Sequence, residues 1–341
     1  MNGVTEKETM SKKAILARIL QSSGFGALLG KATPWSGVLV LNYHRIGDGR
    51  HSLFDRGLWS ATPEDFACQL QFCKSCADVI SPPDLPQVVK KGRGRYVLIT
   101  FDDGYRDNYV TAFPILIEHV VSATFFVATG FLDDQKLAWW DEIAWMVRTS
   151  TQASIMLPDW FSAPIIMDEP DREIAVRSLL RKYKTLAPER AVMFMEAVAG
   201  ATGTGRYCAD AGRELWMTWD MVREMKSSGM SIGGHTVTHP VLSTTSTAGQ
   251  REEILGCGRR LTEELGEPMR YFSYPVGGKE SFNDDTEVCL REAGIQYAFS
   301  YYGGFRRFDD WDDYDIRRVA VETDLTSDVF RSIVSMPQVF A

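Results

Sequence analysis

Seven short β-rich runs recur along the chain, and they constrain its fold more than any other feature. They are Gly37–Tyr43, Tyr96–Phe101, Ala123–Ala128, Met230–Gly233, Tyr271–Tyr274, Tyr297–Tyr301 and Ile316–Val321. Near-continuous apolar runs such as Tyr96–Phe101 are typical of parallel strands that are covered on both faces. Helical patterns separate the runs, and seven or eight strand–helix repeats predict an α/β fold, a distorted (β/α)7–8 barrel. An open doubly wound sheet is the alternative, although no Gly-rich phosphate loop follows the first run.

The length of 341 residues suits one catalytic barrel domain, which we assign to residues 34–341. Residues 133–215 break the strand–helix rhythm with a Trp-rich segment and a polar helical stretch from Asp171 to Ala199. We interpret them as an insertion that forms a lid or substrate wall, or that is only a structural elaboration. Residues 1–33 are interpreted as an N-terminal helical arm, which packs on the body or makes weak contact with a membrane surface.

Composition narrows the classes of partner and compartment. A formal net charge of -8 and the lack of a basic tract argue against nucleic-acid binding. Six cysteines are too sparse for a disulfide scaffold and favour a reducing compartment. Arg18 interrupts the apolar run near the N-terminus, so we expect no cleaved signal peptide. The expected location is therefore the cytoplasm or the inner face of the membrane.

Polar side chains gather where the expected strands end. His44, Asp102, Asp103, His235 and Tyr274 all lie at or just after such an end. In parallel α/β barrels this rim is where active sites are built. The spacing of His235 and His239 lets two imidazoles converge on one ion, although the pattern alone is a weak signal. The adjacent carboxylates of Asp102 and Asp103 repel each other unless a positive charge, such as a metal ion, offsets them; a simple turn is the alternative.

Two segments resemble motifs of the polysaccharide deacetylase family, also called the NodB-homology or carbohydrate esterase 4 group. Thr100–Tyr105 reads T-F-D-D-G-Y and resembles the first motif, and His235–Pro240 reads H-T-V-T-H-P and resembles the second. The resemblance extends from about Val38 to Val321. It implies a hydrolase that removes N-acetyl groups from an N-acetylated glycan with one divalent metal ion, Zn²⁺ by ligand type, or else Co²⁺, Ni²⁺ or Mn²⁺.

The resemblance also implies a role for each matching residue. Asp103, His235 and His239 would hold the metal, and Asp102 would be the general base. The metal would polarise the acetyl carbonyl and lower the pKa of its bound water toward ~7.

The third motif departs from the usual family pattern. Phe272–Gly277 lacks the arginine that normally precedes Pro-Tyr, and we assign Tyr274 and Pro275 to substrate binding or orientation. A backbone N–H near Tyr274 is expected to help hold the oxyanion. Arg318 is expected to orient Asp102, with a surface charge on an edge strand as the alternative.

The family's usual late histidine, which protonates the departing amine, is missing, because no histidine follows His239. His44 remains, in a Tyr-His pair that resembles the N-terminal motif of bacterial poly-N-acetylglucosamine deacetylases, whose motifs are circularly permuted. We therefore expect His44 to be the general acid, with a structural histidine as the alternative. The first and last strands of a closed barrel are neighbours, so such a permutation preserves the geometry of the site.

Two other functions remain open from sequence. One is a hydrolase of another non-peptide C–N bond on the same fold. The other is a non-catalytic carbohydrate-binding relative, which would be expected to have lost a metal ligand or the base; this sequence retains them.

Overall fold

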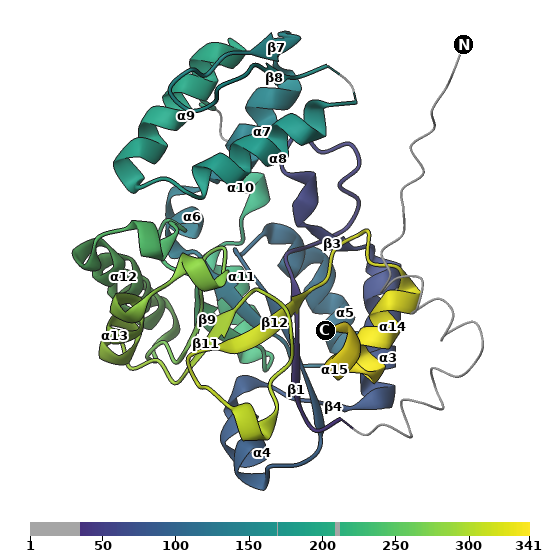
Figure 1. Cartoon of the computed structure of the whole chain (residues 1–341). Helices are drawn as coiled ribbons and strands as arrows, with labels where there is room; N and C mark the ends of the chain where they lie inside the picture. The colour runs from purple at the N-terminus through teal and green to yellow at the C-terminus, as the bar shows by residue number, and fades with distance from the viewer. Residues whose placement is uncertain (1–34, 169, 209–211) are drawn as a thin grey trace, which may run out of the picture.

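The computed structural model describes residues 35–168, 170–208 and 212–341 (Figure 1). The helical arm expected at residues 1–33 lies outside the described residues. Seven parallel strands form the barrel: β1 (Gly37–Tyr43), β5 (Arg95–Phe101), β6 (Thr124–Val127), β9 (Ser231–Gly234), β10 (Tyr271–Ser273), β11 (Tyr297–Ser300) and β12 (Ile316–Ala320). Each coincides with one of the seven runs expected from the sequence.

Strand β1 closes the barrel. It pairs in parallel with β12 on one side, where Val40 lies opposite Arg318, and with β5 on the other, where Tyr43 lies opposite Phe101. The order around the barrel is β1-β12-β11-β10-β9-β6-β5 and back to β1. The closed seven-stranded barrel is thus confirmed, and the open doubly wound alternative is wrong. A short strand, β4 (Asp78–Val79), pairs in parallel with the start of β5, at Tyr96 and Val97, ahead of the pairing of β5 with β6.

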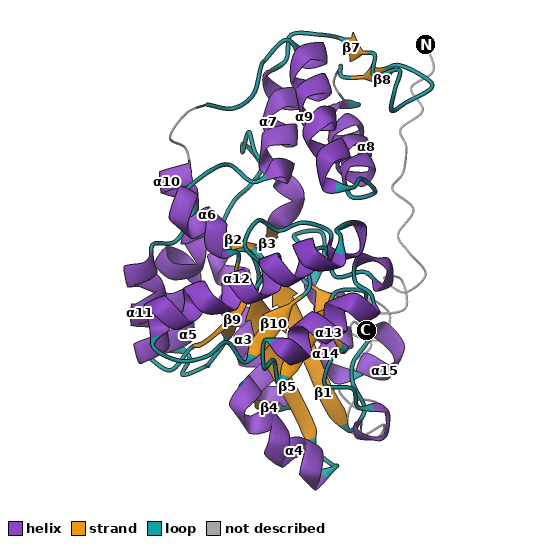
Figure 2. Cartoon of the chain, turned by 90° about the vertical axis from the view of Figure 1, so that its left-hand side faces the viewer, coloured by secondary structure: helices purple, strands orange, loops and turns teal. Residues whose placement is uncertain are grey.

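Helices surround the strands, as Figure 2 shows in purple and orange. They are α3 (Pro63–Cys76), α4 (Leu85–Lys91), α5 (Phe113–Glu118), α6 (Thr129–Asp134), α11 (Trp219–Ser227), α12 (Thr247–Leu265), α13 (Asp284–Glu292), α14 (Ser327–Ser335) and α15 (Pro337–Phe340). The cap of α3 was predictable, since the Thr62 side chain accepts a hydrogen bond from the Asp65 N–H and a proline stands at the first helical position.

The interior of the barrel changes from apolar to polar along the strands. Side chains two residues apart point the same way in a strand, so Val38, Val40 and Asn42 of β1 face one side. Val38 and Val40 belong to an apolar cluster with Leu98, Phe126, Tyr271, Phe299 and Ile316. Farther along, the buried inward positions are Asn42, Thr100, Ser273 and Arg318. The polar end coincides with the carboxyl ends of the strands, where barrel active sites lie.

The insertion covers this polar end (Figures 1 and 2). It comprises α7 (Trp139–Thr149), a hairpin of β7 (Ser154–Ile155) and β8 (Ile165–Ile166), α8 (Arg172–Tyr183), α9 (Pro188–Thr202) and α10 (Gly212–Leu215). The helical stretch expected between Asp171 and Ala199 is two helices, because the chain turns after Lys184 and α9 restarts at Pro188. The insertion contributes Ile143, Leu179 and Phe194 to an apolar cluster that also includes Tyr105, Ala128 and Phe131 from the barrel side.

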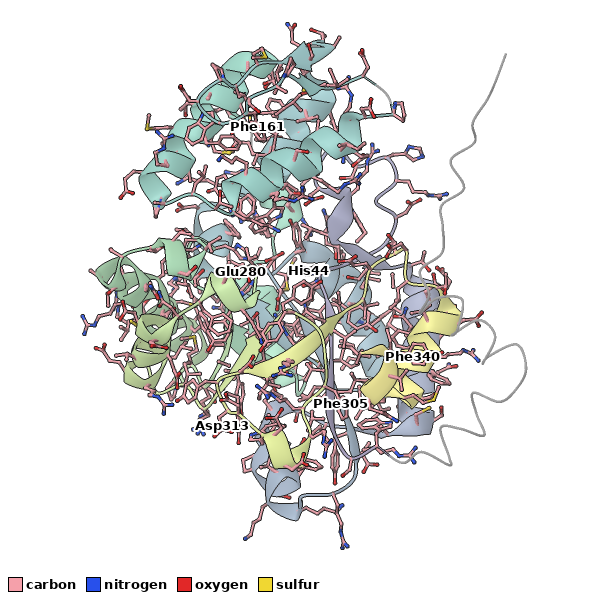
Figure 3. All side chains as sticks on the ribbon, in the orientation of Figure 1. His44, Phe161, Glu280, Phe305, Asp313 and Phe340 are labelled. Atoms are coloured by element: carbon pink, nitrogen blue, oxygen red, sulfur yellow. The ribbon has the colours of Figure 1, made fainter. Side chains whose placement is uncertain are left out.

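Figure 3 orients the two ends of the barrel: His44 lies at the end facing the insertion, which carries Phe161, whereas Phe305 and Asp313 lie at the far end. Among the described residues, no helix has both the length and the apolar character needed to cross a membrane. A small parallel pair, β2 (Arg45–Ile46) and β3 (Trp59–Ala61), continues the chain beyond β1 at the polar end.

Candidate active site

Three buried side chains converge at the polar end of the barrel. Asp103 stands two residues beyond β5, and His235 directly follows β9. The Nε2 atoms of His235 and His239 are 3.1 Å apart, and each is 3.5 Å from Oδ1 of Asp103. The structure therefore brings together the three residues that the sequence suggested as metal ligands.

These distances fit a bound cation. Zn²⁺ takes nitrogen and oxygen ligands at about 2.0–2.2 Å, and at tetrahedral angles such ligands lie roughly 3.4 Å from one another. The three observed separations are close to that value. A carboxylate and two imidazole nitrogens, all buried and facing one point, form a donor set suited to Zn²⁺, Co²⁺ or Ni²⁺.

Neighbouring groups hold both imidazoles in place. His235 donates through Nδ1 to the Ser273 carbonyl at 2.7 Å, which leaves its Nε2 lone pair for the site. His239 has no hydrogen-bond partner for Nδ1 among the described residues. It is held instead by the Trp139 indole N–H, 3.3 Å from its carbonyl oxygen, and by a T-shaped contact with the Trp140 ring.

The loop between the two histidines is fixed from α12. The Glu253 carboxylate accepts the N–H groups of Val237 and Thr238 at 2.9 and 2.8 Å and the Thr238 hydroxyl at 2.6 Å. The strand before this loop needs glycine at position 234, because a Cβ there would lie 2.1 Å from the Met269 sulfur.

Backbone strain concentrates at this site. Among the described residues other than glycine, six have positive φ, and four of them lie here: Asp103, Thr236, His239 and Val276. Such conformations cost on the order of 1–3 kcal/mol each and persist where surrounding structure enforces them. Two of the four are candidate ligands, so the fold stabilises an unfavourable backbone in order to place them.

The two histidines differ electrostatically. Burial lowers the pKa of His239 to about 3, and the neighbouring His235 adds to this effect. Burial opposes ionisation of His235 as well, but the negative charges of Asp102 and Asp103 raise its pKa overall. His239 is thus neutral at physiological pH, which is the form that can bind a metal.

Asp102 and Arg318 form a buried bidentate ion pair inside the barrel. Two guanidinium nitrogens of Arg318 lie 2.8 Å from the two carboxylate oxygens. Arg318 also donates to Asn42 Oδ1 and to the Ser273 hydroxyl. Arg318 is fully buried, so the surface-charge alternative is wrong. Burial works against ionisation of Asp102, but Arg318 overcomes it and holds the pKa of that carboxyl well below its usual range.

His44 faces the same pocket from the end of β1. Its N–H donates to the Ser60 hydroxyl at 3.0 Å and its carbonyl accepts from the Asn108 amide at 2.7 Å, so its backbone is fixed. The imidazole makes a T-shaped contact with the Tyr301 ring. Burial lowers the pKa of His44, although the charges of Asp103 and Asp102 oppose this.

A pocket of about 240 Å³ joins all these groups. Its lining includes His44, Asp102, Asp103, His235 and His239 from the barrel, and Trp139, Trp140, Arg177, Leu180 and Lys184 from the insertion. The insertion therefore forms one wall of the pocket.

The third motif needs correction. Tyr274 lines the pocket, but its N–H donates to the Phe299 carbonyl and its hydroxyl to the Tyr314 carbonyl, so neither is free for a substrate. Pro275 is not among the lining residues, whereas Val276 is. The strand pairing with β11, which the sequence does not reveal, uses the N–H group of Tyr274.

Several residues of the site were missed from sequence. Asn42 and Ser273 had a signal, since each is a polar residue at an inward position of a strand. No sequence signal distinguished three others from ordinary charged residues in loops and helices: Glu253 on α12, Asp55 in the loop after β2 and Glu322 after β12.

Comparison with known proteins agrees with this architecture. The family model described as polysaccharide deacetylase matches residues 89–154 and 175–298, more than half of the chain. The putative polysaccharide deacetylase YxkH of Bacillus subtilis (strain 168) is 53% identical over 308 residues, which cover 86% of this chain and 75% of that protein.

Solved structures share the fold at low identity. The Streptococcus pyogenes deacetylase PplD in complex with acetate has a TM-score of 0.57 and 18% identity, covering 91% of this chain and 100% of that one. IcaB from Ammonifex degensii has a TM-score of 0.55 and 20% identity, covering 89% and 98%. On the family match and the curated relative, this chain belongs to the polysaccharide deacetylase family, whose members are hydrolases acting on carbon–nitrogen bonds of acetylated polysaccharides.

Proposed function

We propose that this chain is a divalent-metal-dependent deacetylase that hydrolyses the N-acetyl group of an acetylated sugar. One observation carries the proposal. A single pocket holds three converging candidate ligands, a carboxylate kept ionised by a buried arginine, and a histidine on a fixed backbone. A carbohydrate-binding relative without activity would have no need for the buried Asp102–Arg318 pair beside the ligand cluster.

Asp103, His235 and His239 are the residues that would hold the ion. A bound Zn²⁺, Co²⁺, Ni²⁺ or Mn²⁺ would supply a Lewis acid for the acetyl carbonyl and would lower the pKa of a bound water toward ~7. The chain's own residues would do the rest of the chemistry.

Asp102 is the base in this proposal. It stays ionised because of Arg318, and Ser273 donates to the same carboxylate at 3.2 Å, so it is oriented to accept a proton from the attacking water. His44 delivers a proton to the departing nitrogen, so one water is consumed and acetate and a free amine are formed. With its acid directly after the first strand, the chain would belong to the circularly permuted type.

The Val276 amide is the proposed backbone donor to the oxyanion. Val276 lines the pocket with a left-handed backbone, φ 63°, and its N–H has no hydrogen-bond partner in the part of the chain that the structure describes. It replaces the amide of Tyr274, which is bonded within the sheet.

An acetate-release assay over a panel of N-acetylated oligosaccharides tests the function. We expect the metal-loaded protein to release acetate from at least one of them, chelation to abolish release, and His239→Ala to lose both metal and activity. Release of a product other than acetate would favour hydrolysis of another C–N bond. Full activity after complete metal removal would contradict the proposal.

A further inference from the structure

Four charged side chains line the pocket without a part in the chemistry proposed above. Arg177 and Lys184 come from α8 and the residue after it, in the insertion. Asp55 comes from the loop after β2, and Glu322 from the loop after β12. Two cations on the insertion thus share the pocket with two carboxylates on the barrel.

The two basic side chains are positioned by the geometry of α8, and they form what we call the basic wall of the pocket. Arg177, Leu180 and Lys184 are spaced by three and four residues, so they lie on one face of α8. All three line the pocket, whereas Arg181 on the same helix does not.

The two carboxylates, Asp55 and Glu322, form the acidic wall of the pocket and are positioned by α7 and by β1. The Asp55 N–H donates to Oδ1 of Asp141 at 2.8 Å, and one Asp55 oxygen accepts the Gly57 N–H at 2.9 Å. Glu322 follows Val321, whose N–H donates to the Asn42 carbonyl on β1. Both carboxylates are therefore anchored through their backbone.

The opposite charges face one another without closing into ion pairs. Among the described residues, Lys184, Arg177, Asp55 and Glu322 form no ion pair within 4.0 Å, yet Lys184 interacts electrostatically with both Asp55 and Glu322. Burial lowers the pKa of Lys184 and raises the pKa of Asp55 and of Glu322. Asp55 is half-buried, whereas Lys184 and Glu322 remain accessible to solvent. Charged groups that line one pocket and keep open hydrogen-bonding capacity are suited to a polar ligand between them.

The balance of charge selects the ligand class. An anionic substituent would be attracted by the two cations of the basic wall but repelled by the two carboxylates. An ammonium group would be attracted by the carboxylates but repelled by the cations. A hydroxyl group can accept from an ammonium and donate to a carboxylate at once. We infer that Lys184, Asp55 and Glu322 bind the ring hydroxyls of a neutral N-acetylated sugar and so determine substrate specificity. This rests on the proposed function of the same pocket.

The test compares three substrates of the metal-loaded enzyme: a neutral N-acetylated oligosaccharide, an N-acetylated sugar acid, and an aryl acetate that has no hydroxyl groups. Hydrogen bonds to charged groups contribute enough that Lys184→Met should lower the ratio of kcat/KM for the neutral sugar to that for the aryl acetate by about 10- to 100-fold. The loss should appear chiefly in KM. Lys184→Arg, which keeps the charge and donors, should recover part of it.

Arg181→Ala is the matched control, because it removes a cation from α8 that does not line the pocket, and its ratio should equal that of the parent. An unchanged ratio in Lys184→Met, or a parent enzyme that prefers the sugar acid to the neutral sugar, would overturn this inference alone. A parent that releases no acetate from any N-acetylated sugar would overturn the proposed function, and the inference with it.

Discussion

At the scale of single residues, the pairing of Asp102 with Arg318 separates base chemistry from metal binding. Asp102→Asn leaves all three candidate ligands in place, so we expect metal content to stay near one ion per chain. Turnover should fall by about 10²–10⁴-fold, the typical contribution of a positioned acid–base group. Stability should also fall, because Arg318 loses part of its counter-charge in a buried site. Elemental analysis and kcat check the prediction, and near-normal kcat would refute the assignment of the base.

His44 gives a second residue-scale prediction. His44→Ala should keep the metal, and its turnover on an unactivated acetamide should fall by about 10²-fold or more, because an amine leaves only when protonated. Hydrolysis of an ester with a good leaving group should be affected far less, since that group needs little protonation. Parallel assays on both substrates decide the matter. Equal losses on the two substrates, or loss of the ion, would show that His44 is a structural or ligating residue instead.

The site residues that stand at strand ends or within a motif could be predicted from the sequence. Those whose role depends on how distant segments pack together could not. His44, Asp103 and His235 could be placed because each follows an apolar run. The amide of Tyr274 was misassigned because its pairing with Phe299 depends on the register of two strands. Lys184 was missed because its role depends on how the insertion lies over the barrel.

At the scale of elements, α7 is tied to the first motif by a buried chain of hydrogen bonds. The Trp140 indole N–H donates to the Tyr105 hydroxyl at 2.7 Å, and that hydroxyl donates to Asp141 at 2.6 Å. Asp141 accepts in addition from the N–H of Asp55. Tyr105 stands two residues after Asp103, so the insertion is linked directly to the segment that carries a candidate ligand.

This link predicts a pH dependence of stability. Burial raises the pKa of Asp141 to about 7 from its usual 3.8, although Arg45 and Tyr105 oppose this. The unfolded chain releases this proton near pH 4 and the folded chain near pH 7, so the folded state binds more protons between those values and loses stability as pH rises. The loss between pH 5 and pH 8 should be about 3 kcal/mol.

Urea unfolding of the parent and of Asp141→Asn at the two pH values isolates this effect, because the other titrating groups are common to both proteins. The parent should lose more stability than the variant as pH rises from 5 to 8. The same pH dependence in both proteins would show that Asp141 ionises normally.

At the scale of the whole molecule, the sequence predicted the barrel because each strand is a local pattern and strand–helix alternation allows few topologies. It left the number of strands open at seven or eight, since a strand as short as β4, which pairs with the start of β5, has no pattern of its own. Closure through β1 and β12 is a contact between residues almost 280 apart, and no local pattern records it.

Closure also brings the candidate ligands together from distant parts of the chain, which predicts a link between metal binding and global stability. Asp103 follows β5 and the two histidines follow β9, so the site exists only in the folded barrel. An ion at 1,000 times its Kd should then stabilise the fold by about 4 kcal/mol, which should raise the melting temperature by about 5–10 °C. Asp102→Asn should keep this shift, and His239→Ala should lose most of it.

Cys73 and Cys76 are the alternative site for the stabilising ion, because their spacing matches half of a zinc ribbon. Cys73 is buried, however, and burial raises the pKa of its thiol. A shift that survives in His239→Ala but disappears in Cys76→Ser would place the stabilising ion on α3 and contradict the link between the barrel's closure and its metal.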